Sequence, residues 1–228
     1  MESIKQAVDL VLSLDKELLQ IIGVTMRMSF FSTTISCVIG LPLGALIGMK
    51  RFRGKSFLKK LLHTWMGLPP VVAGLFVYLL FTHYGPFGKL NMLFTVKVMV
   101  VAQCLLIAPL VTAMTAAFVE STSKPILETA HGIGLSGPRK VCLCLSEGRS
   151  SLLSVVLNAF GRSIAEVGAV SIVGGNIQWK TRVMTTAIML ETNKGKFSFA
   201  LALGIILLLI AFVVNAAASW IVKERTDG

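Results

Sequence analysis

The sequence is poor in charged residues, and this scarcity excludes an ordinary soluble protein. Only 14% of its 228 residues are Asp, Glu, Lys or Arg, whereas a soluble domain has about 25%. Acidic residues are the scarcer class, 11 against 22 basic ones, so the formal net charge is +11. The basic residues form short blocks between apolar stretches. This pattern is typical of membrane orientation and not of nucleic-acid binding.

Histidine and cysteine are also scarce, which argues against metal sites, cofactors and catalysis. The three histidines are scattered, and Cys142-x-Cys144 lacks the paired spacing and histidine partners of a zinc site. Gly132-x-Gly134-x-x-Gly137 matches a dinucleotide-binding pattern, but no strand precedes it and no P-loop is present. We therefore expect no catalytic residues, no metal, no cofactor and no ATP site in this chain.

What the sequence has is five long stretches almost free of charge. Each exceeds the roughly 20 residues that a helix needs to cross about 30 Å of hydrocarbon. The runs are continuous and not alternating, which favours helices over a barrel. We predict an all-α polytopic membrane protein with a transmembrane domain at residues 18–222. Its five spans are expected at about residues 25–49, 61–84, 96–119, 150–174 and 197–222.

The flanking segments predict the orientation of the chain. Six basic residues and no acid lie between Lys50 and Lys60, so this loop belongs in the cytoplasm. Five spans then put the N-terminus outside and the C-terminus inside a plasma membrane. Residues 1–17 mix apolar and charged side chains and predict an amphipathic segment, with no cleaved signal peptide. Residues 223–228 are expected to form a cytoplasmic tail.

The cytoplasmic loop at residues 120–149 is too long for a plain connection. Within it, Pro125 to Gly134 predicts a short helix, since proline suits a first helical turn and glycine ends a helix. Such a helix suits docking onto a partner. A capped loop helix without a partner fits the residues equally well.

Two features mark the interior of the predicted spans. Pro69 and Pro70 remove two backbone donors and predict a kink that faces protein or a cavity, serving either packing or the shape of a pathway. Arg162 and Glu166 lie four apart on the fourth span, and neither should face lipid. They are expected to pair with each other as a structural pair, which is favoured, or to line a route where Arg162 attracts an anion.

Several motifs resemble a known family. Glu128-Thr129-Ala130, followed after three residues by Gly134, resembles the coupling loop of binding-protein-dependent ABC importer permeases, although the usual Ile-x-Leu-Pro ending is absent. The segment 67–74, Gly-Leu-Pro-Pro-Val-Val-Ala-Gly, resembles molybdate and tungstate permeases. Residues 160–169, 173–177 and 181–191 are similar to the tungstate branch.

The resemblance implies a type I ABC importer permease fold, in which Glu128, Thr129, Ala130 and Gly134 couple to the ATPase. It also implies two copies of an ATP-binding subunit, an extracytoplasmic binding protein and a second copy of this chain. Pro69 and Pro70 would shape the pathway, and the cargo would be tungstate or molybdate. Alternatives are another oxyanion or small solute, a membrane-embedded enzyme, which lacks a nucleophile here, or a channel, which needs no such cytoplasmic loop.

Overall fold

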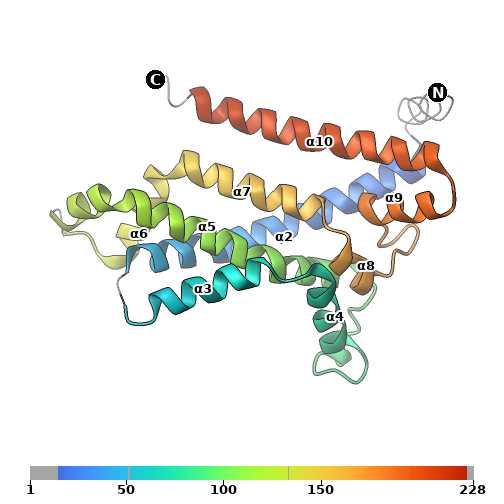
Figure 1. The fold of residues 1–228 in the computed structure, drawn as a ribbon, viewed down its shortest axis with the longest axis horizontal. Helices are drawn as coiled ribbons and strands as arrows, with labels where there is room; N and C mark the ends of the chain where they lie inside the picture. The colour runs from blue at the N-terminus through green and yellow to red at the C-terminus, as the bar shows by residue number, and fades with distance from the viewer. Residues whose placement is uncertain (1–14, 51, 133, 225–228) are drawn as a thin grey trace.

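The computed structural model describes residues 15–50, 52–132 and 134–224, and every regular element within these ranges is helical. The long helices lie side by side along the longest dimension of the molecule, while α4 turns away from them (Figure 1). The elements are α2 (Lys16–Met49), α3 (Lys55–Met66), α4 (Pro70–Phe81), the 3₁₀ turn η1 (Gly88–Leu90), α5 (Val96–Gly132), α6 (Gly137–Glu147), α7 (Arg149–Ile164), α8 (Gly168–Gly174), α9 (Met184–Asn193) and α10 (Phe197–Glu224).

The all-α membrane architecture predicted from the apolar runs is confirmed. Helices α2, α5 and α10 are each long and apolar enough to cross a membrane. Two bent pairs, α3 with α4 and α7 with α8, pass the same test when each pair is taken together, which gives up to five spans. The second span is broken where the prolines predicted a kink, and the fourth span is broken where a continuous helix was expected.

Parallel helices α2 and α5 pack closely along much of their length. A Cβ atom added to Gly44 would lie 2.6 Å from the carbonyl oxygen of Thr112, and one added to Gly48 would lie 2.8 Å from Cβ of Val119. Such short distances mean that the helix backbones touch, as small residues allow in membranes. This pair makes the most extensive contact between helices in the described part of the chain.

The two prolines break the second span completely. Helix α3 ends at Met66, Pro69 caps α4, and Pro70 is the first residue of α4. The two helix axes meet at 94°. A proline lacks a backbone N–H, and its ring disfavours a helical conformation in the preceding residue. The predicted kink is thus a sharp elbow, after which α4 points away from the long helices (Figure 1).

The loop predicted at residues 120–149 is mostly helical. Helix α5 runs without interruption through Pro125 to Gly132, so no separate helix begins at Pro125. One proline removes one backbone donor, and no glycine lies between positions 96 and 131 to end the helix. A second helix, α6, follows, with Pro138 in its first turn and Ser136 at its N-cap position.

The first helix begins earlier than the predicted first span. Helix α2 begins at Lys16, nine residues before position 25, and the Asp15 carboxylate accepts hydrogen bonds from the backbone N–H groups of Glu17 and Leu18. Its first turns pack Leu18 and Ile21 against α9 and α10. The rest of the predicted amphipathic segment, residues 1–14, lies outside the described residues, as do residues 225–228 of the predicted tail.

Ion pairs connect helices at both ends of the bundle. Lys59 and Lys55, at the start of α3, contact the Glu120 carboxylate of α5 at 2.5 and 3.5 Å. At the opposite end, Arg182 donates to Glu17 of α2 at 2.9 Å. The basic segment around residue 50 therefore shares one end of the molecule with the last turns of α5. The beginning of α2 shares the other end with residues 178–182.

Candidate functional site

The breaks in the second and fourth spans face each other around a small cavity of about 330 Å³. Pro70 and Val71 at the start of α4 form one side, and Arg162 with residues 165–168 forms the other. Pro69 immediately precedes this wall as the cap of α4. The fold therefore brings together the predicted proline and charged residues, which lie more than 90 positions apart in the sequence.

Arg162 and Glu166 do not form the helical pair that their spacing suggests. Helix α7 ends at Ile164, so Glu166 lies beyond its last turn. The Glu166 carboxylate is buried and accepts a hydrogen bond from the backbone N–H of Ala169 in the first turn of α8, at 3.3 Å. No ion pair joins Arg162 to Glu166 in the described structure. The favoured expectation of a mutual ion pair is wrong, because the i, i+4 geometry requires a helix that stops too early.

The side chain of Arg162 is exposed, and it forms no hydrogen bond or ion pair with another described residue. It lies 13 residues after Arg149 at the start of α7, or about 20 Å along a helix that rises 1.5 Å per residue. An arginine at this depth is costly to expose to lipid. The face that carries Arg162 therefore requires water or protein next to it.

A buried polar cluster fixes the backbone beside Arg162. The hydroxyl of Ser163 lies 2.9 Å from the hydroxyl of Ser32 in α2, and Gln103 Nε2 of α5 donates to the carbonyl of Ser163 at 3.1 Å. On the other side of the break, the Thr185 hydroxyl donates to the carbonyl of Glu166 at 2.7 Å. The bonds from Gln103 and Thr185 give the two carbonyls partners from other helices at the break. Arg162 is thus a free side chain on an anchored backbone.

Sequence analysis missed this polar cluster. Its signal is a row of hydroxyl residues on α2 at helical spacing, because Thr25, Ser29, Ser32 and Ser36 are all buried. Hydroxyl side chains bond readily across helices in a membrane. Their partners on α5 and α7 follow no local pattern, so the sequence alone does not identify them.

The predicted coupling segment lies at the end of α5. Glu128, Thr129 and Ala130 are in the last turns of this helix, and their side chains lie outside the described residues. Gly134 follows the helix, is exposed, and has φ +67° with no neighbouring atom near an added Cβ. Glycine adopts this left-handed conformation without steric cost. The connection from α5 to α6 projects at one end of the bundle (Figure 1).

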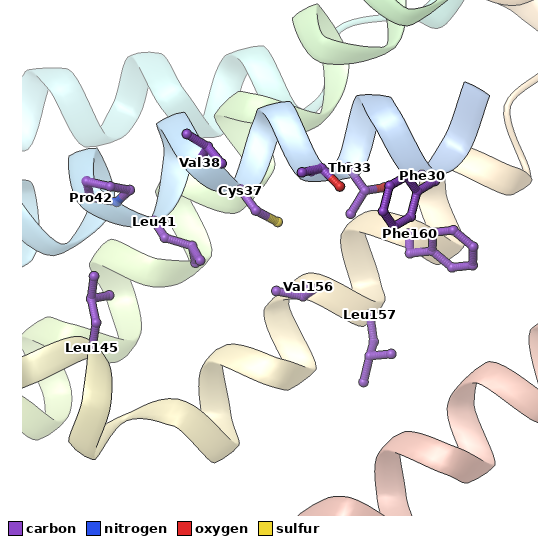
Figure 2. A pocket seen from close by; sticks show the side chains of 11 residues that line it. Phe30, Thr33, Cys37, Val38, Leu41, Pro42, Leu145, Val156, Leu157 and Phe160 are labelled. Carbon is purple, nitrogen blue, oxygen red and sulfur yellow. The ribbon is translucent and has the colours of Figure 1, made fainter. Parts of the chain in front are cut away.

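A larger cavity of about 480 Å³ lies between α2 and α7. Figure 2 shows Cys37 and Leu41 of α2 on one side and Val156, Leu157 and Phe160 of α7 on the other. Its lining is almost entirely apolar and holds no charged side chain. Apart from Thr33 and Thr34 it offers a charged solute almost no hydrogen-bonding partners, so it is poorly suited to an anion.

Comparison with known proteins gives a consistent result. Residues 40–226 match the family model described as binding-protein-dependent transport system inner membrane component. The tungstate uptake system permease protein TupB of Peptoclostridium acidaminophilum is 35% identical over 94% of both chains. TupB of Campylobacter jejuni is 39% identical over 94% of this chain and 90% of its own.

Solved structures agree on the fold. An inward-facing structure of the MetNI methionine ABC transporter superposes with a TM-score of 0.74, covering 91% of this chain and 95% of that one. Its sequence identity to this chain is 16%, so the likeness concerns the fold alone. The overall fold is therefore one that a solved importer structure shares.

Proposed function

This chain belongs to the family of binding-protein-dependent transport system inner membrane components, and from this membership we propose that it is the permease of an ATP-driven tungstate importer. It is a transport component of a cell membrane and not an enzyme. The family works with an ATP-binding subunit and a substrate-binding protein. Tungstate is favoured because two relatives that match nearly the whole chain are tungstate uptake permeases; molybdate is the second candidate.

One structural observation supports an anionic cargo. Arg162 is exposed at membrane depth beside the cavity between the two broken spans. Exposing the Arg162 guanidinium to lipid costs free energy, and a single chain offers it no acidic partner in the described structure. In the proposed homodimer, the Arg162 side chains of both copies face the central route. There they provide a positive potential for a tetrahedral dianion, since guanidinium binds oxyanions through several N–H donors.

Coupling to ATP hydrolysis is proposed at the C-terminal end of α5. Glu128, Thr129, Ala130 and Gly134 form the part that docks on the ATP-binding subunit, two copies of which serve the dimer. ATP binding closes these subunits and moves the attached helix ends, so the spans alternate between inward-open and outward-open states. The switch is a rigid-body change that nucleotide drives by binding one state more tightly.

The orientation follows from the distribution of basic residues. We propose that the end with Lys55, Lys59 and Glu120 is cytoplasmic, because positive residues flank the cytoplasmic ends of spans. The end with Glu17 and Arg182 is then extracytoplasmic. The N-terminus is outside and the C-terminus inside.

The test is anion uptake in cells that lack the chromosomal copy of this gene. Cells supplied with the wild-type chain should accumulate tungstate, and sulfate in excess should compete poorly. Arg162→Gln should lower uptake about tenfold or more at equal protein level, because a charge-assisted hydrogen bond contributes about 1.5–3 kcal/mol. Arg149→Gln, at the other end of α7, is the matched control and should transport normally. Uptake of sulfate or molybdate in preference to tungstate would replace the proposed cargo.

A further inference from the structure

A third cavity carries positive charge and lies apart from the two described above. It has a volume of about 670 Å³ and lies between the outer parts of α2 and α5, covered at one end by residues 90–92. Arg27 of α2 and Lys97 of α5 both line it, and no acidic residue does. Further along the two helices, the wall of the cavity consists of Phe31 and Ile35 of α2 and Val100 and Val101 of α5. The cavity thus joins two cations to an apolar groove.

The two cations lie at one level of the bundle. Helices α2 and α5 run parallel, with Gly40 opposite Val111 and Gly48 opposite Val119. The same offset of 71 positions places Arg27 opposite Val98, next to Lys97. Lys97 precedes Glu120 by 23 residues, or about 35 Å of helix. Since Glu120 marks one end of the bundle through its lysine contacts, Lys97 and Arg27 lie at the opposite boundary of the hydrocarbon layer.

Neither cation is neutralised within the described structure. Arg27 and Lys97 are exposed and form no hydrogen bond or ion pair with another described residue. A second copy of the chain offers little to neutralise them, because its described acids at this end are already engaged. These acids are Asp15, which caps α2, Glu17, bonded to Arg182, Glu166, bonded to Ala169, and Glu191, bonded to Lys194.

We propose that this cavity binds an anionic phospholipid of the outer leaflet. The phosphate lies between Arg27 and Lys97, and one acyl chain follows the groove along Phe31 and Val101. A phospholipid satisfies both halves of the cavity, because its charged headgroup and its apolar chain are covalently joined. A free oxyanion satisfies only the cations and leaves its remaining oxygens against apolar side chains. The bound lipid bridges α2 and α5 at the end where α2 extends beyond α5.

The experiment is native mass spectrometry of the complete transporter purified from membranes and exposed to defined lipids. Phosphatidylglycerol should be retained in preference to phosphatidylethanolamine. The double variant Arg27→Gln/Lys97→Gln should retain about 25-fold less phosphatidylglycerol, since each basic residue near a membrane surface contributes about fivefold to binding anionic lipid. Lys180→Gln changes an exposed cation at the same end but outside the cavity, and it should behave as wild type.

A second variant keeps the test decisive if the double variant does not assemble. Val101→Trp fills the groove and retains both cations, so it should also reduce phosphatidylglycerol retention. Unchanged retention in both Arg27→Gln/Lys97→Gln and Val101→Trp would overturn the proposal, and so would equal retention of the two lipids. Displacement of the bound lipid by millimolar tungstate would identify an oxyanion site instead. None of these outcomes depends on which anion the transporter carries.

Discussion

The hydroxyl groups of Ser32 and Ser163 lie 2.9 Å apart, although 131 positions separate the two residues in the chain. This contact joins α2 to the last turn of α7, and Gln103 of α5 holds the same turn through the carbonyl of Ser163. It lies directly beside Arg162, so the side chain proposed to meet the anion depends on three helices for its position.

A double-mutant cycle on Ser32→Ala and Ser163→Ala should reveal this contact. We expect a coupling of about 0.6 kcal/mol, the average for hydrogen bonds between membrane helices. The measurement is thermal unfolding of the purified protein in detergent for both single variants and the double variant. Ser154→Ala, an exposed serine on the same helix, should show no coupling with Ser32→Ala. A coupling of zero for the buried pair would contradict the importance of the contact.

Gly44→Ala should destabilise the protein strongly for a change of one methyl group. The added carbon would lie 2.6 Å from the backbone oxygen of Thr112, and relieving such overpacking costs about 1–3 kcal/mol. Gly23→Ala on the same helix is the control, because no atom lies within 4 Å of its added carbon. The apparent melting temperature of each variant distinguishes them. Equal melting temperatures would show that α2 and α5 are not packed backbone to backbone.

Glu166 should tolerate glutamine but not leucine. Its carboxylate accepts the N–H of Ala169 at the start of α8, and a glutamine oxygen can accept the same bond. Glu166→Leu leaves that buried donor unpaired, at a cost of about 1–3 kcal/mol. Protein level and melting temperature measure the effect. Adding Arg162→Gln to Glu166→Leu should not restore stability; a full rescue would instead indicate the ion pair that the described structure lacks.

Gly134→Trp should uncouple ATP hydrolysis from transport. The glycine is exposed at the proposed docking end, and a large side chain there obstructs contact with the ATP-binding subunit. Gly195→Trp is a matched control, since Gly195 has a similar φ of +75° and equally open surroundings at the opposite end. Stimulated ATPase activity and tungstate uptake should be measured in reconstituted transporters. Normal coupling in Gly134→Trp would exclude this segment from docking.

Cys142 should react with a maleimide applied from the cytoplasmic side only. It is exposed on α6, whereas Cys144 on the same helix is buried. Burial raises the pKa of the Cys144 thiol, so less thiolate forms there at a given pH and the buried thiol reacts slowly. Cys142→Ser should therefore remove the rapid phase, and Cys144→Ser should retain it. Rapid labelling from outside would reverse the proposed orientation.

The sequence by itself determined the class of protein and most of its spans. Uncharged runs longer than the bilayer require helices, because no other open structure satisfies backbone hydrogen bonds in hydrocarbon. The elbow at Pro69 and Pro70 was also predictable, as proline removes a donor wherever it occurs. The motifs around Glu128 and Gly134 indicated the family. Each of these features depends only on residues that are close together in the sequence, so each can be predicted without the fold.

Only the tertiary structure decided where the fourth span breaks and what that break does to its charges. Residues 165–167 contain neither proline nor glycine, so nothing local predicts an end to the helix there. At the break, Gln103 and Thr185 donate from other helices to the backbone carbonyls of Ser163 and Glu166, and these bonds stabilise the interruption. That break separates Glu166 from Arg162 and leaves the arginine unpaired in the described structure. The spacing of Arg162 and Glu166 predicted a shared helix face, but contacts with distant segments determined the backbone there. A buried backbone group needs a hydrogen-bond partner, and only the fold determines which groups are close enough to provide one.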